Sequence, residues 1–155
     1  MSIKKKLSNI RFPASSTPAV IYAILCTFLL IIVSNFVDLP YLFGNWEVKA
    51  KSILSFSLID NYYPPGAAIA LIPFLWAGPE YSIGVFFYYF LSCYFYGQIC
   101  EIIKNSKYKT LALLALPLNP YLSWLCLTSA DQVVELFFLM LFSYALTIRT
   151  TCNLS

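Results

Sequence analysis

The feature that most constrains this chain is an uncharged apolar run over residues 19–37, nineteen residues long. As a helix, a run of this length extends about 28 Å and matches the hydrocarbon thickness of a bilayer. Hydrophobic residues make up 60% of the 155 residues and charged residues only 11%, whereas soluble domains carry about 25% charged residues. The sequence therefore predicts an all-α, polytopic transmembrane protein, with residues 1–155 forming one transmembrane domain.

Basic residues gather at the edges of the apolar runs and not along a continuous face. Eight of the ten are Lys4, Lys5, Lys6 and Arg11 before the first run, Lys104, Lys107 and Lys109 in a later interruption, and Arg149 after the last run. This placement is typical of cytoplasmic membrane edges and argues against a nucleic acid partner. We expect residues 1–18 to form a cytoplasmic basic tail. The first run then acts as an uncleaved signal anchor in the plasma membrane or the endoplasmic reticulum.

Four runs are expected to cross the bilayer. The first is residues 19–37, which Thr17 and Pro18 precede as suitable helix-start residues. The others are residues 81–103, residues 110–127, which prolines interrupt, and residues 132–148. Lys104, Lys107 and Lys109 then fall on the cytoplasmic side, as the positive-inside rule requires, provided that residues 66–76 do not cross.

Residues 38–65 are expected to form an outer or lumenal loop. Trp46, Ala50 and Ile53 recur within it at helical spacing, which predicts a short amphipathic helix on the membrane surface. The following apolar segment, 66–76, has eleven residues and contains Pro73. Because this is too short for a full crossing, we expect a re-entrant or interfacial segment. The alternative, in which residues 61–77 just span, stays open at this stage.

Three acidic residues could carry chemistry. Asp38 stands at the outer end of the first run and is either an ordinary loop acid or a general base. Asp131 and Glu135 stand four residues apart, hence on one face of a helix. Glu135 lies inside an apolar run, where an ionisable group normally faces a cavity or a partner. The plainer interpretation is a protonated or water-facing carboxyl near the membrane edge.

The cysteines point to no metal site and no disulfide framework. The chain has five of them, none in a C-x-x-C pair, and it has no histidine. Structural zinc sites need such ligands at short spacing. We therefore expect neither a metal nor another cofactor, and we interpret the cysteines as small apolar residues within the spans.

The order of the motifs suggests a family. Asp38 ends the first run, Tyr63-Pro64-Pro65 closes the outer loop, and Asn119-Pro120 precedes Asp131 by about a dozen residues. Over roughly residues 4–149 this order resembles the N-terminal part of the GT-C superfamily of membrane glycosyltransferases. Those enzymes take sugar from a polyprenyl-phosphate or polyprenyl-diphosphate carrier at the outer or lumenal face.

The resemblance implies an activity and a set of site residues. Asp38 matches the catalytic base of the family, which removes the acceptor proton during an inverting transfer, for example of mannose. The residues assigned to substrate binding, either because they match a family motif or because they lie near one in the sequence, are Tyr63, Lys49, Lys51, Asn119, Asp131 and Glu135. The implied partners are the bilayer and a polyprenyl-phosphate sugar donor.

The chain also departs from that family, which leaves alternatives. Family members commonly have eight or more spans, and the cations that usually hold the lipid phosphate come from later helices. We therefore expect a protein that is incomplete or inactive alone: a truncated product, half of a split enzyme, or a non-catalytic membrane subunit of a larger complex. In a further alternative, a small transporter or channel component, Asp131 and Glu135 would line a pathway.

Overall fold

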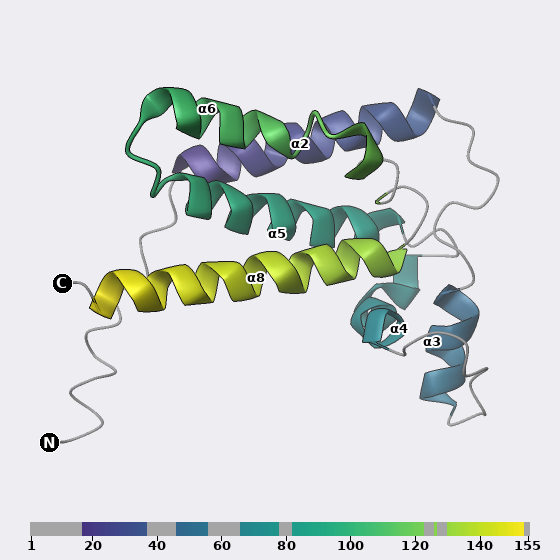
Figure 1. The fold of residues 1–155 in the computed structure, drawn as a ribbon. Coiled ribbons are helices and arrows are strands. Elements are labelled where there is room, and N and C mark those ends of the chain that lie inside the picture. The colour runs from purple at the N-terminus through teal and green to yellow at the C-terminus, as the bar shows by residue number, and fades with distance from the viewer. Residues whose placement is uncertain are drawn as a thin grey trace, which may run out of the picture.

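The computed structural model describes residues 17–36, 46–55, 66–77, 82–122, 126 and 130–153, and within these ranges it contains helices and no strand. The helices are α2 (Thr17–Phe36), α3 (Trp46–Leu54), α4 (Gly66–Leu71), the 3₁₀ helix η1 (Ile72–Ala77), α5 (Ser82–Cys100), α6 (Ser106–Ala115) and α8 (Ala130–Asn153). Figure 1 shows α2, α5 and α8 running side by side along one long axis. The expected all-α class is confirmed.

Three helices in the described ranges are long and apolar enough to cross a membrane: Thr17–Phe36, Ile83–Cys100 and Ala130–Arg149. They match three of the four expected spans and indicate an integral membrane protein. The fourth expected span, residues 110–127, does not form one long helix. Helix α6 ends at Ala115, because Pro117 and Pro120 each remove a backbone N–H that a continuous helix would need.

Side-chain contacts fix the directions of the helices. In α2 and α5, Tyr22 pairs with Tyr96 at a ring-centroid distance of 6.4 Å, and Cys26, further along α2, lies near Cys93, earlier in α5. These two helices are therefore antiparallel. In α5 and α8 the ring pairs Tyr88–Phe137 and Phe95–Tyr144 advance together along both helices, so α5 and α8 are parallel.

These directions bring the ends of the three long helices into register. The start of α2 and the ends of α5 and α8 lie at one end of the bundle (Figure 1). The stretch after α5 that contains Lys104, Lys107 and Lys109, together with Arg149 of α8, belongs to this end. We call it the basic end, and the opposite end, where α2 stops and α8 begins, the far end.

Small residues form the closest part of the seam between α2 and α5. Ala19, Ala23 and Cys26 of α2 are buried, and Gly97 of α5 faces Ala19 so closely that a Cβ atom there would lie 3.2 Å from the Ala19 Cβ. Lipid chains are as apolar as leucine, so helices in a bilayer associate largely through close van der Waals packing of this kind. Gly97 is therefore needed for the approach of the two backbones.

The seam between α5 and α8 is aromatic instead. Phe137 of α8 stacks at 5.2 Å from Tyr88 and 6.2 Å from Phe95, and Tyr144 lies 5.3 Å from Phe95, all between ring centroids. These distances are within the favourable range for tilted ring pairs. The wider side chains hold α8 alongside α5.

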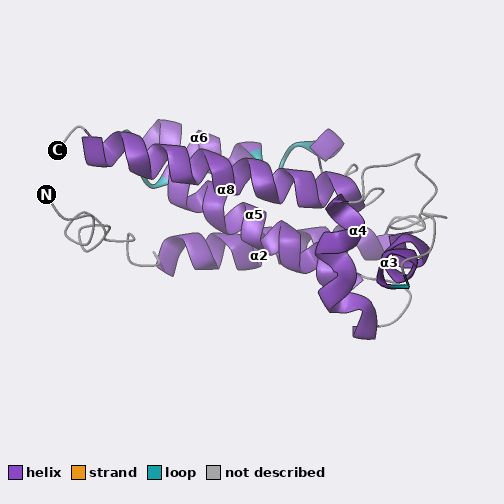
Figure 2. Cartoon of the chain, turned by 90° about the horizontal axis from the view of Figure 1, so that it is seen from below, coloured by secondary structure: helices purple, strands orange, loops and turns teal. Residues whose placement is uncertain are grey.

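Helices α3, α4 and η1 gather at the far end, where α4 packs on both α3 and the first part of α8 (Figures 1 and 2). The predicted helix from Trp46 is confirmed as α3. The predicted short apolar segment is confirmed as α4 and η1, with six residues in each. About 20 Å of α-helical and 3₁₀ rise cannot cross a 30 Å core, so this segment does not form a full span.

Two tyrosine hydroxyls donate hydrogen bonds to backbone carbonyls that a proline leaves without their usual N–H donor. The Tyr22 hydroxyl donates to the Leu113 carbonyl at 2.8 Å, and the residue four positions on, Pro117, has no N–H to offer that carbonyl. The Tyr88 hydroxyl donates to the Ala70 carbonyl at 2.7 Å. There the chain tightens to a 3₁₀ helix, in which the backbone N–H three residues on would donate to the Ala70 carbonyl. That residue is Pro73, which has no N–H. In a bilayer such backbone groups must be satisfied from within the protein.

Candidate functional site at the far end of the bundle

Two described members of the expected site, Lys51 and Asp131, lie at the far end. Helix α3 carries Lys51, Asn119 follows α6, and Asp131 lies in the first turn of α8. Figure 1 places α3, α4 and the start of α8 at this end, away from the basic end. Lys51 and Asp131 therefore lie toward one end of the molecule, and Asn119 follows the break after α6.

Asp131 is the most constrained of these side chains. It is half-buried, and its Oδ1 atom has neither exposed surface nor a hydrogen-bond partner among the residues that the structure describes. Its position in the first turn of α8 lets the carboxylate interact favourably with the helix dipole. A partly enclosed carboxylate oxygen of this kind can accept a hydrogen bond from a ligand or from another protein group.

Glu135 lies one turn further along α8 and is exposed. The sequence placed it on the same face as Asp131, in a cavity or against a partner, and its exposure excludes a cavity formed by the described part of the chain. Within those residues no ion pair involves Glu135. Its carboxylate therefore faces the surroundings of the bundle.

Asn119 has a local structural role. It is exposed, and its Oδ1 atom accepts a hydrogen bond from the Leu122 N–H at 3.1 Å. This is the bond by which asparagine caps a new helical turn. Asn119 therefore restarts the helix after the break at Pro117. Its amide group has a further N–H₂ that the cap does not use.

Three of the expected site residues are less defined. Asp38 and Tyr63 lie outside the described residues, as does the side chain of Lys49, whose backbone belongs to α3. The Lys51 side chain is exposed on α3. Their assignment to catalysis and substrate binding therefore stays a prediction.

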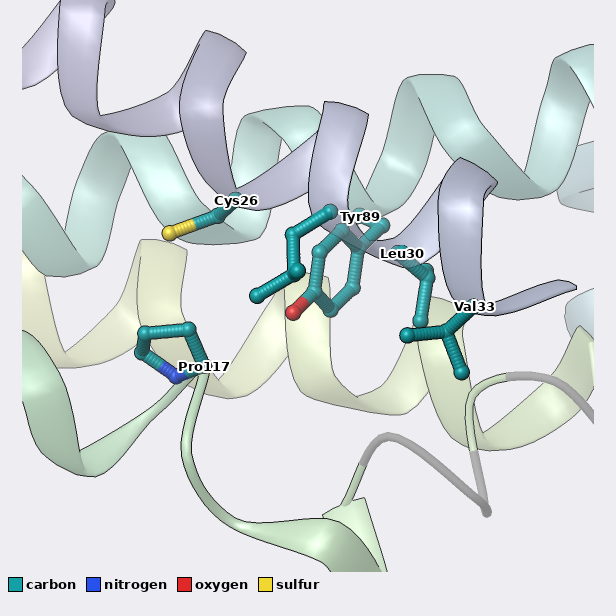
Figure 3. Close-up of a pocket in the computed structure, with 6 residues that line it drawn as sticks. Cys26, Leu30, Val33, Tyr89 and Pro117 are labelled. Carbon is teal, nitrogen blue, oxygen red and sulfur yellow. The ribbon is translucent and has the colours of Figure 1, made fainter. Parts of the chain in front are cut away.

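A separate pocket lies deep in the bundle, between α2, α5 and the break after α6 (Figure 3). Its lining includes Cys26, Leu30, Tyr89 and Pro117, and the Tyr89 hydroxyl points toward Pro117. A volume of about 30 Å³ holds one or two water molecules. It is too small for a sugar, so this pocket is not a site for glycosyl transfer.

The same region contains contacts that the sequence pattern did not reveal. The Cys26 and Cys93 thiols lie within hydrogen-bonding reach of each other, and Cys93 also reaches the Tyr89 hydroxyl. The described cysteines are free, and the described ranges hold no group of three or more His, Cys, Asp or Glu side chains suited to a metal ion. In the sequence, the one indication of these contacts was that apolar spans rich in tyrosine and cysteine must bury some hydroxyl and thiol groups, which then need partners.

Comparison with known proteins gives no relative. No protein-family model matches the chain, and neither a curated protein nor a solved structure matches it.

Proposed function

We propose that this chain is a membrane glycosyltransferase-like protein that works on a polyprenyl-phosphate-linked sugar at the far end of its helical bundle. The proposal rests on the order of Asp38, the Tyr63-Pro64-Pro65 turn, Asn119-Pro120 and Asp131 along the chain. One structural observation supports it above the others. The Asp131 carboxylate, half-buried where α8 begins, keeps one enclosed oxygen without a partner in the described ranges.

The topology that we propose has four crossings. Because α5 and α8 are parallel, a chain in which both cross must return between them. Helix α6 starts at the basic end beside α5, where Lys109 pairs with Glu101 at 2.7 Å. The chain then runs past Pro117 toward Cys126, which is buried. A broken helix lined by protein is an accepted way to cross a bilayer.

The orientation follows from charge. The basic end holds Lys104, Lys107, Lys109 and Arg149, and positive residues favour the cytoplasmic side. The far end then faces outside or into a lumen. Asp38 directly follows α2, which stops at the far end, so the loop that it opens starts on the same side as Asp131.

The chemistry in this proposal is an inverting displacement. An acceptor hydroxyl oxygen forms a bond to the anomeric carbon of the sugar while the bond from that carbon to the carrier phosphate oxygen breaks. Asp38 takes the hydroxyl proton, and the carrier phosphate leaves with the bonding electron pair. Lys49 or Lys51 would stabilise the negative charge on that phosphate. Tyr63, Asn119 and Asp131 are the proposed sugar-binding and acceptor-binding groups, and Glu135, which is exposed on α8, is left out of that set.

The test replaces Asp38 by Asn in the full chain and measures sugar transfer. Native membranes in which the variant is the only source of the chain are given a radiolabelled polyprenyl-phosphate sugar. A general base contributes about 10²–10⁴-fold to rate, so transfer should fall at least about a hundredfold. Asp60→Asn is the matched control, since it removes an acid from the same loop and should leave transfer unchanged. Equal turnover in wild-type and Asp38→Asn membranes would overturn the base assignment, and transfer that does not depend on the chain at all would overturn the function.

The topology is tested separately by labelling single cysteines in a cysteine-free background. Residues 38 and 131 should react with an impermeant maleimide added outside intact cells or sealed vesicles. Residue 107 should react only after permeabilisation. Opposite accessibility of residues 38 and 131 would rule out a shared site.

A further inference from the structure

The outward face of α8 carries an acidic residue within an apolar stripe. Exposed residues recur along this helix about every three to four positions, singly or in adjacent pairs: Glu135, Phe138 and Leu139, Phe142, Ala145 and Leu146, and Arg149. The opposite face carries Val133, Val134 and Phe137, which pack on α4 and α5. The apolar part of the stripe suits lipid equally well, so only the charged residue distinguishes this face from an ordinary lipid-facing surface.

Glu135 lies within the candidate span and not at its edge. The span begins at Ala130, and five residues of helical rise place Glu135 about 7.5 Å inside it. A carboxylate at this depth is costly against lipid and normally faces the interior of a bundle or a partner. Among the described residues Glu135 is exposed and forms no ion pair.

We infer that this face of α8 binds a transmembrane helix of a second membrane protein, and that the partner helix carries a lysine or arginine at the depth of Glu135. Charge complementarity selects this occupant. The three candidate spans of a second copy contain no cation at that depth, because their only basic residue is Arg149 at the basic end. The Asp131 carboxylate one turn away would strengthen the attraction for the same cation. The inference does not depend on sugar transfer.

The experiment uses the full chain in liposomes with synthetic leucine-rich transmembrane peptides, and it measures association by energy transfer between labels on chain and peptide. One peptide carries a lysine five residues inside the end that lies beside the start of α8. A second carries leucine there, and a third carries the lysine near its other end. A polar pair in a membrane is worth about 1–2 kcal/mol, or roughly tenfold in affinity. The first peptide should therefore bind about tenfold more tightly than the other two.

Variants of the chain assign the effect to Glu135. Glu135→Gln should abolish the preference for the first peptide. The matched control Glu101→Gln, which removes a carboxylate at the basic end, should keep it. Glu135→Lys should transfer the preference to a peptide with glutamate at the same depth.

Three results would overturn the inference. One is equal binding of all peptides to the wild-type chain, which would mean that Glu135 reaches the aqueous edge alone, and this comparison needs no variant to fold. The second is an undiminished preference in Glu135→Gln. The third is energy transfer between two labelled copies of the chain that Glu135→Gln abolishes, since that would make the occupant a second copy. Failure of the sugar-transfer assay would leave these readouts unaffected.

Discussion

The two faces of α5 achieve helix packing in opposite ways. Toward α2 it presents Gly97 and Cys93 to small residues, and the backbones approach so closely that Gly97 has no room for a Cβ without displacing Ala19. Toward α8 it presents Tyr88 and Phe95, whose rings stack on Phe137 and Tyr144. At the first seam, small side chains let the two backbones come close together. At the second, large aromatic side chains fill a wider space between the helices.

This difference predicts different tolerance to substitution. A close backbone contact is disturbed when a side chain is added, because the facing helix must shift to make room for it. An aromatic seam can adjust when one ring becomes smaller, because neighbouring rings and lipid can take up part of the space. The α2–α5 seam should therefore be the more sensitive of the two.

The largest expected effect comes from Gly97→Leu. The new side chain would start 3.2 Å from the Ala19 Cβ and the Tyr22 Cδ1 and 3.3 Å from the Ala19 Cα, so α2 must move away. We expect a loss of about 3 kcal/mol in the free energy of unfolding in mixed micelles. The Cys26–Cys93 disulfide that mild oxidation should form in the wild-type chain should also no longer form. Gly66→Leu is the control, because nothing lies within 4 Å of the Cβ position there, and an equal loss in both variants would contradict the seam as the cause.

A smaller effect is expected from Phe95→Leu in the aromatic seam. The substitution removes the ring contacts with Phe137 and Tyr144 but keeps an apolar side chain, so the free energy of unfolding should fall by about 1 kcal/mol. Phe142→Leu makes the same exchange on the exposed face of α8, where the side chain is 63% exposed, and should cost almost nothing. A Phe95→Leu effect as large as that of Gly97→Leu would remove the distinction between the seams.

Tyr22→Phe sharpens the comparison, since it removes one hydroxyl beside the small-residue seam without changing its shape. The Leu113 carbonyl would lose its donor, and hydrogen bonds inside membrane proteins are worth about 0.6 kcal/mol on average. In a Pro117→Ala background the backbone N–H of residue 117 can serve that carbonyl instead. A double-mutant cycle should then show that Tyr22→Phe costs less in that background. If Tyr22→Phe lowers the free energy of unfolding equally in both backgrounds, Pro117 is not the reason why the Leu113 carbonyl needs the Tyr22 hydroxyl.

The apolar runs were enough to predict most of the fold. Expected spans at residues 19–37, 81–103 and 132–148 correspond to α2, α5 and α8, and the helix at Trp46 and the short segment with Pro73 also form. The fourth span, expected over residues 110–127 with prolines interrupting it, stays a prediction, and the described part of it breaks after Ala115. Periodicity shows which residues avoid water, but in a lipid-embedded chain nearly all of them do.

The neighbours of each helix could not be predicted for that reason. Nothing in the pattern says that Gly97 meets Ala19 or that Tyr22 serves Leu113, because these depend on shape and on backbone groups freed elsewhere. The candidate site shows the same division. Of the described parts of the motif order, Asp131 lies in the first turn of α8 at the far end, and Asn119-Pro120 follows the end of α6. The exposure of Glu135 and the capping role of Asn119 could not be predicted from the sequence and were found only in the structure.

The smallest expected effect lies outside both seams, at the ion pair that holds the start of α6 to the end of α5. Lys109 Nζ lies 2.7 Å from Glu101 Oε2, and both side chains are 30% exposed. Water and salt therefore screen the pair, and Lys109→Gln should lower the free energy of unfolding by about 0.5 kcal/mol or less, with the difference vanishing at high salt. Lys107→Gln, an exposed neighbour, is the control. A loss as large as that at Gly97 would mean that the ion pair holds α6, whereas the Tyr22 and Tyr96 bonds to the Leu113 and Ala112 carbonyls indicate that tyrosine hydroxyls hold it.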